Sequence, residues 1–83
     1  MNYHLGDIVS SIAGRDIDEK YIVWGMDNDM LLLVNGKSRK LSNPKKKKTK
    51  HVTFYKKSEA LIENLENDKK INDAYLRKIL SRE

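Results

Sequence analysis

The spacing of the apolar residues changes near residue 57, and this change limits the fold more than any other feature of the sequence. Before it, short segments rich in β-branched and aromatic residues are separated by Gly, Asn, Asp and Ser. Such segments are typical of short β-strands joined by turns. After it, apolar residues recur every three or four positions, as on one face of an α-helix. The sequence therefore predicts a mainly β fold with an α-helical appendage.

Five strands are predicted in the first part of the chain. Their ranges are residues 6–13, 19–26, 30–34, 37–41 and 50–56. Asn35-Gly36 is a dipeptide that strongly favours a two-residue β-hairpin, so it would join the third strand to the fourth. Five short strands at close spacing favour a small barrel over a sandwich.

Two short amphipathic helices are predicted after the strands, with Ser58 and Asn72 as their N-caps. Helices of this length are marginal alone in water, so each needs a surface to pack against. We expect a barrel at residues 1–56 and a helical hairpin at residues 57–83 that packs on it. The alternative is that a helix in residues 58–83 pairs with a partner protein.

Size and composition exclude several classes of site. The chain has 83 residues, enough for one small domain, and it has no cysteine, so it has no disulfide or thiolate metal site. Two histidines without a metal-binding motif predict no metal and no cofactor. The N-terminal stretch has no signal-peptide pattern, and the longest apolar run, Met30 to Val34, is too short to span a membrane. A cytoplasmic location without a membrane partner is therefore expected.

The charge is distributed in blocks. Residues 1–36 carry a net charge of −4, residues 37–57 carry +10 and residues 58–83 carry −1, in a chain with a net charge of +5. The excess positive charge thus lies in one segment of 21 residues. Such clustering is typical of proteins that bind a polyanion.

The centre of that segment, "SNPKKKKTKHV" at residues 42–52, is predicted to be a loop between the fourth and fifth strands. Pro44 would stiffen its start. A run this charged cannot be buried without paired anions, so we interpret it as a phosphate-binding loop. Two other interpretations remain open: a solvated loop that aids solubility, and a loose match to a nuclear localisation signal.

Several stretches also carry a family resemblance. "GDIVSSIAGRD", followed by a hydrophobic strand and "LLVNGKSRKL", resembles the KOW motif, with Gly14 at the position of its fixed glycine. The run through "NPKKKKTKHV" resembles bacterial KOW-domain proteins related to the ribosomal protein families L14e, L6e and L27e. The resemblance covers roughly residues 5–54 and implies an SH3-like barrel that binds RNA, with ribosomal RNA as the expected partner. Ile17, Asp18 and Glu19 depart from it, because KOW motifs usually carry a second glycine there.

The candidate RNA-binding residues are cations of the basic segment and of the turn near Gly14. They are Arg15, Lys37, Arg39, Lys40, Lys45, Lys46, Lys47, Lys48, Lys50 and His51. Arg39 has a planar guanidinium suited to a bidentate phosphate or guanine contact, with an ion pair to Asp16 or Asp29 as the structural alternative.

The aromatic residues add less. Phe54 is predicted to lie in the core. Trp24 either packs in the barrel or stacks on a base, and Tyr55 either stacks or is covered by the helices.

No nucleophile elbow, P-loop or paired base is present, and turns explain the aspartates, so no enzymatic activity is predicted. The expected function is RNA binding in or near the ribosome. A protein-interaction module of the transcription or translation machinery and a double-stranded DNA binder are the alternatives.

Overall fold

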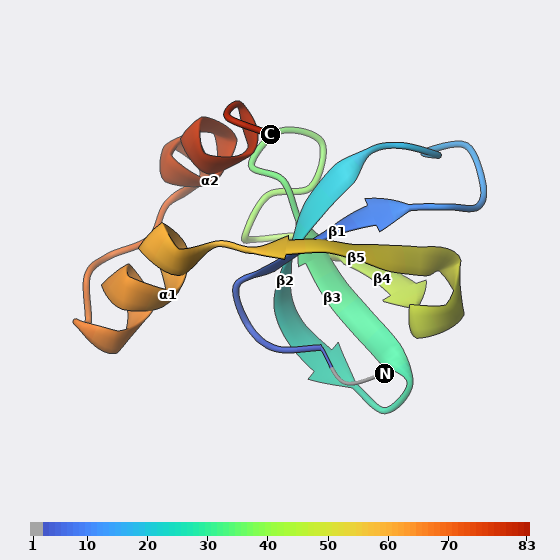
Figure 1. Ribbon diagram of the computed structural model, residues 1–83, viewed down its shortest axis with the longest axis horizontal. Helices are drawn as coiled ribbons and strands as arrows, with labels where there is room; N and C mark the ends of the chain where they lie inside the picture. Colours follow the sequence, from blue (N-terminus) through green and yellow to red (C-terminus); the bar gives the residue numbers. More distant parts are fainter. Residues whose placement is uncertain (1–2) are drawn as a thin grey trace.

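The computed structural model describes residues 3–83 and contains one antiparallel sheet followed by two helices (Figure 1). The elements are β1 (Asp7–Ser11), β2 (Lys20–Asp27), β3 (Met30–Val34), β4 (Lys45–Lys48), a 3-10 turn (Thr49–His51), β5 (Val52–Lys57), α1 (Glu59–Glu66) and α2 (Asp73–Leu80). The predicted mainly β fold with two C-terminal helices is confirmed. The first two residues of the predicted 1–56 domain lie outside the described residues.

The strands are ordered β4-β3-β2-β1-β5, so the first strand pairs with both the second and the last. β4 and β5 are neighbours in sequence but lie at opposite edges of this order. The 3-10 turn that joins them is tied to the rest of the sheet. Its His51 carbonyl accepts from the Ile12 N–H at 2.9 Å, and its Thr49 N–H donates to the Asp29 carbonyl at 3.3 Å.

The predicted strand at 37–41 is wrong. Residues 35–44 form a loop, and β3 pairs instead with β4 at residues 45–48. The cause is the Asn35 side chain, whose oxygen accepts from the Lys37 and Arg39 N–H groups, both at 2.9 Å. An amide that bonds its own following backbone favours a wider local turn over a two-residue hairpin.

The predicted basic loop is also wrong at its centre, because Lys45–Lys48 is the strand β4. Successive side chains of a strand point to opposite faces, so a run of four lysines need not bury four charges on one side. Position 47 alone is buried in this strand, with 8% of Lys47 exposed.

The sheet packs on both of its faces. One apolar cluster contains Tyr3, Val9, Tyr21, Val23, Leu31, Leu33 and Val52. The other joins sheet residues to the helices and contains Ile8, Ile22, Val34, Leu61, Leu76 and Ile79. Trp24 is half-buried against the second cluster. The helices therefore bury Leu61, Leu76 and Ile79 against the sheet.

The predicted burial of Phe54 is wrong, since 42% of this residue is exposed. β5 is an edge strand, and every residue after Val52 in it is exposed. A bulge in the β1–β5 pairing also lets Tyr55 fall between the partners of Ile8 and Val9, and 45% of Tyr55 is exposed. The helices therefore do not cover Tyr55.

The predicted N-caps are observed, and α2 also holds the 35–44 loop. Ser58 Oγ accepts from the Leu61 N–H, and Asn72 Oδ1 accepts from the Tyr75 N–H. Two contacts then join α2 to the loop: Asp73 Oδ1 accepts from the Leu41 N–H at 2.8 Å, and Arg77 Nη1 donates to the Gly36 carbonyl at 2.6 Å. A side chain at position 36 would collide with the Asp73 backbone, so only glycine fits there.

Replacing Leu76 with alanine tests whether the helices belong to the folded unit. Leu76 is fully buried in the cluster shared by helices and sheet, so Leu76→Ala should lower the free energy of unfolding by about 3 kcal/mol. Urea denaturation measures this change. The control is Leu5→Ala, at a position that is 49% exposed, which should have a small effect. Equal, small effects of the two substitutions would contradict docking of α2.

Candidate nucleic-acid interface

The Asp16 carboxylate joins the β1–β2 turn (residues 12–19) to β4. It accepts four side-chain hydrogen bonds, from Ser11 Oγ at 2.8 Å, Tyr21 OH at 2.8 Å, Lys45 Nζ at 2.9 Å and Lys47 Nζ at 2.6 Å. Lys47 Nζ also donates to the Ala13 carbonyl at 2.9 Å. We call Ser11, Asp16, Tyr21, Lys45 and Lys47 the Asp16 cluster.

The Asp16 cluster is largely withdrawn from solvent. The side chains of Asp16 and Lys47 are 12% and 9% exposed, and that of Lys45 is 29% exposed. Burial pushes the pKa of Asp16 up, but the hydrogen bonds from Lys47, Lys45, Ser11 and Tyr21 outweigh it and hold that pKa well below its usual range. Burial, together with the bond to Asp16, raises the pKa of Tyr21. At neutral pH Asp16 is therefore an anion, and it accepts a hydrogen bond from the protonated Tyr21 hydroxyl.

The lysines of β4 are thus divided between two faces. Lys45 and Lys47 point to Asp16, whereas Lys46 and Lys48 are exposed. Lys46 Nζ lies 3.5 Å from Asp27 Oδ2, but both side chains are more than half exposed, and such surface pairs contribute little to stability. Strand alternation, with Lys45 and Lys47 held by Asp16, therefore leaves Lys46 and Lys48 exposed to solvent.

A groove runs between the β1–β2 turn and β4. Its walls include Ala13 and Gly14 on one side and Lys46, Lys47, Lys48 and His51 on the other, and its volume is ≈ 310 Å³. Gly14 has a φ of +85°, a conformation that favours glycine and fixes the shape of the turn beside β4. Arg15, which follows Gly14, and Lys50, which precedes His51, are both exposed. The groove therefore unites two segments that sequence analysis proposed separately.

The other predicted contacts lie elsewhere. Lys37 and Lys40 are exposed and Arg39 is half-buried in the 35–44 loop. Figure 1 shows this loop beside α2, whereas the β1–β2 turn and the 3-10 turn lie at the far end of the sheet. Within residues 3–83, Arg39 forms no ion pair with Asp16 or Asp29, the alternative suggested for it.

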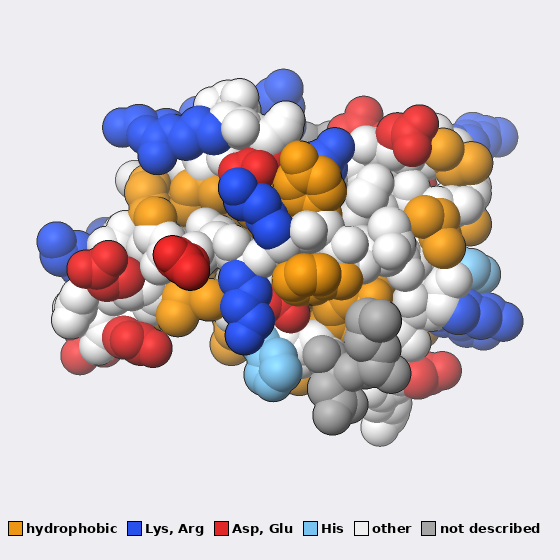
Figure 2. Space-filling model, viewed as in Figure 1, with side chains coloured by type: hydrophobic (Ala, Val, Ile, Leu, Met, Phe, Trp, Pro, Cys, Tyr) orange, Lys and Arg blue, Asp and Glu red, His pale blue; other side chains and the backbone are white. Residues whose placement is uncertain are grey.

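Two features of this surface have no clear signal in the sequence. The five side chains of the Asp16 cluster come from β1, the β1–β2 turn, β2 and β4, and only recognition of β4 as a strand could have indicated the cluster. The second feature is Lys20, whose Nζ lies 4.8 Å from the centroid of the Tyr55 ring, a cation–π distance. Figure 2 shows one face of the molecule, on which Lys and Arg side chains lie at both ends and also near the centre, among exposed hydrophobic side chains.

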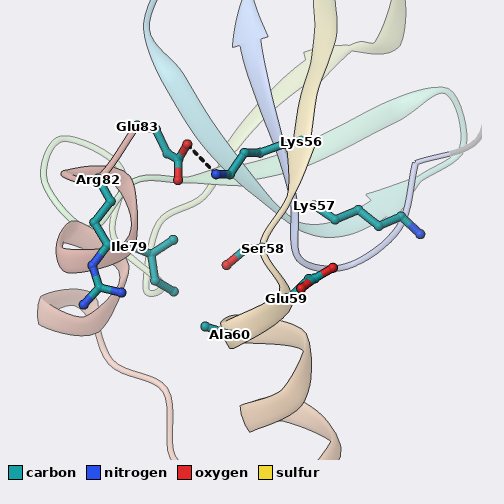
Figure 3. A pocket seen from close by; sticks show the side chains of 8 residues that line it. All are labelled: Lys56, Lys57, Ser58, Glu59, Ala60, Ile79, Arg82 and Glu83. Atoms are coloured by element: carbon teal, nitrogen blue, oxygen red, sulfur yellow. Dashed lines mark ion pairs between the residues drawn. The ribbon is translucent and has the colours of Figure 1, made fainter.

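A larger cleft, of ≈ 600 Å³, lies at the other end of the sheet, where β5, α1 and the end of α2 meet (Figure 3). Lys56 Nζ pairs there with Glu83 Oε1 at 2.9 Å, and this hydrogen bond raises the pKa of Lys56. Glu59 adds another carboxylate to the same cleft. Its mixed charge makes it a poorer site for a polyanion than the groove beside β4.

No protein-family model matches this sequence, and no curated protein matches it with significance. In the part of the chain that the structure describes, no helix is long and apolar enough to cross a membrane. Among the same residues, no three or more His, Cys, Asp or Glu side chains are grouped so that they could hold a metal ion.

Replacing Asp16 with asparagine should lower the free energy of unfolding at neutral pH by about 2 kcal/mol, because charge-assisted hydrogen bonds to a largely buried group are lost. The folded-state pKa of Asp16 lies below its ordinary value of 3.8, so its stabilising contribution is complete well above pH 3.8 and disappears as the pH falls below it. The difference in the free energy of unfolding between the wild type and Asp16→Asn should therefore become smaller as the pH falls below 3.8. Urea denaturation over a pH series measures it.

The control for this series is Asp18→Asn, a change of equal charge at an exposed position of the same turn. Asp18 has a φ of +72°, which asparagine also tolerates. An Asp16→Asn variant as stable as Asp18→Asn at neutral pH would contradict a structural role for the Asp16 cluster.

Proposed function

We propose that this chain is a non-enzymatic RNA-binding protein whose curved sheet is an SH3-like barrel of the KOW type. The observation that carries the proposal is the groove beside β4, where exposed Lys46 and Lys48 adjoin the turn that contains Gly14. Two further points support it: the resemblance to the KOW motif over roughly residues 5–54, and the charge of +10 in residues 37–57. A first strand that pairs with both the second and the last is compatible with a barrel.

Binding would rest on the phosphate backbone of the RNA. Alternate side chains of a strand are about 6.8 Å apart, a spacing close to that of successive phosphates along an RNA strand, so Lys46 and Lys48 suit neighbouring phosphates. Gly14 has no side chain to obstruct an approaching RNA strand, and His51 lines the same groove. Arg15 and Lys50 are exposed next to Gly14 and His51 in the sequence. These contacts supply affinity without reading bases, and specificity comes from the shape of the RNA.

The 35–44 loop would supply a second, separate set of phosphate contacts through Lys37, Arg39 and Lys40. Because α2 holds this loop through Asp73 and Arg77, its cations keep a fixed position relative to the sheet. Two positive regions at a fixed separation favour a structured RNA over a flexible single strand. The proposed setting is ribosomal RNA, in the ribosome or during its assembly in the cytoplasm, and it rests on the family resemblance.

A role as a protein-interaction module is less well supported. In that alternative the apolar stripes of the helices would bind a partner, but Leu61, Leu76 and Ile79 are already buried in the cluster shared with the sheet. The exposed residues of the helices are mostly polar or charged.

Removing two exposed charges from β4 tests the proposal. The slope measured is that of the logarithm of the RNA-binding constant against the logarithm of the salt concentration. In the double variant Lys46→Gln/Lys48→Gln the magnitude of this slope should fall by about 0.7–0.9 for each lysine lost. The affinity at about 100 mM salt should fall several-fold. Fluorescence anisotropy with a labelled RNA hairpin, over a series of salt concentrations, measures both quantities.

The matched control is Lys69→Gln/Lys70→Gln, the same loss of charge at exposed positions between α1 and α2, far from β4 (Figure 1). This variant should bind almost as the wild type does. Equal losses in the two double variants would show that net charge alone attracts RNA, and unchanged binding of the β4 variant would refute the proposed interface.

Competition between nucleic acids separates RNA binding from the alternative of double-stranded DNA. If the RNA shape selects the partner, an unlabelled structured RNA should displace the labelled hairpin at a lower concentration than duplex DNA of equal length, at one fixed salt concentration. DNA that competes equally well would favour a general polyanion binder.

A further inference from the structure

We propose that Asp16 determines which lysines of β4 can reach RNA, and so limits the number of phosphates that the protein binds. The inference rests on the proposed function and assigns to the same interface a positioning residue that is itself an anion. A run of four lysines would then act as two cations toward RNA.

The contacts of Asp16 carry the first step. Lys45 and Lys47 each donate to its carboxylate, at 2.9 and 2.6 Å. A carboxylate and a phosphate offer a lysine the same kind of charged acceptor, so Asp16 occupies the position that an RNA phosphate would otherwise take. Because the carboxylate belongs to the same chain, its effective concentration near the two lysines is fixed and high, and RNA phosphates must compete with it for their ammonium groups.

Burial carries the second step. The side chain of Lys47 is 9% exposed and also donates to the Ala13 carbonyl. If the Lys47 ammonium turned toward RNA, both hydrogen bonds would break, and the Asp16 carboxylate and the Ala13 carbonyl would each lose a donor. Leaving such groups unpaired is costly, so Lys47 stays with Asp16 when RNA binds.

The strand carries the third step. Since Lys45 and Lys47 are fixed to the β1–β2 turn, the backbone of β4 is held and its alternate residues, Lys46 and Lys48, must face away from Asp16. A surface that is ordered before binding loses less entropy when it meets its ligand. Asp16 therefore withholds two cations and presents two others in a defined place.

Neighbouring lysines give the first test, in a protein whose Asp16 is intact. Lys46→Gln should reduce the salt slope of RNA-hairpin binding by about 0.7–0.9, whereas Lys45→Gln should leave the slope unchanged. Both variants remove one positive charge from adjacent positions of one strand. Equal reductions by the two variants would overturn the proposal.

Asp16→Asn gives the second test. It releases lysines that a phosphate can then bind, so the salt slope should steepen by about 0.7–0.9 for each released lysine, and the affinity at low salt should rise several-fold. The control is Asp18→Asn, which makes the same change in net charge on the same turn and should steepen the slope less. Equal effects of the two aspartate variants would overturn the proposal.

These tests separate the inference from the function on which it rests. If neither Lys46→Gln nor Lys48→Gln alters RNA binding, the interface itself is refuted. If they do, but Lys45→Gln matches Lys46→Gln, only the role of Asp16 fails. Circular dichroism establishes whether Asp16→Asn is folded, and the comparison of Lys45 with Lys46 decides the question even if it is not.

Discussion

The fold of the basic segment depends on one carboxylate. Asp16 pairs with two lysines of a strand that consists only of lysines, and without an anion at this place β4 would bring four unpaired like charges to the edge of the sheet. Ser11 and Tyr21 complete the coordination of the carboxylate from β1 and β2. A single acidic residue in a turn therefore makes it possible for the most charged part of the chain to take part in the sheet.

A second constraint is that both faces of the sheet bury apolar side chains. One face forms its own cluster, with Val9, Val23 and Leu33, and the other receives α1 and α2 over Ile8 and Ile22. For a chain of 83 residues, this second layer adds buried apolar area that a small sheet alone would lack. α2 also holds the 35–44 loop, so the same helix that packs on the sheet places Lys37, Arg39 and Lys40.

Sequence patterns were sufficient where the local signal and the tertiary structure agree. β-branched segments predicted β1 and β2 to within a few residues, the short length and flanking turn signals of residues 30–34 predicted β3, and the caps Ser58 and Asn72 marked the starts of both helices. The hairpin at Asn35-Gly36 failed because the Asn35 side chain bonds its own loop. β4 was missed because strand propensity counts against lysine, and the distant Asp16 that compensates for it leaves no local trace.

At the candidate site, composition indicated the basic segment but not the orientation of its side chains. Exposure of Lys46 and burial of Lys47 follow from strand alternation together with the position of Asp16, and only the correct secondary structure reveals them. The burial predicted for Phe54 failed for a related reason, since nothing in the local sequence marks β5 as an edge strand.

The position of β1 between β2 and β5 has a consequence for the order of folding. Residues 7–11 find one hydrogen-bonding neighbour soon after they are synthesised, but their other neighbour is residues 52–57. Contacts so distant in sequence slow folding, because a long loop must close before they form. During synthesis, one edge of β1 therefore stays unpaired until β5 has emerged from the ribosome.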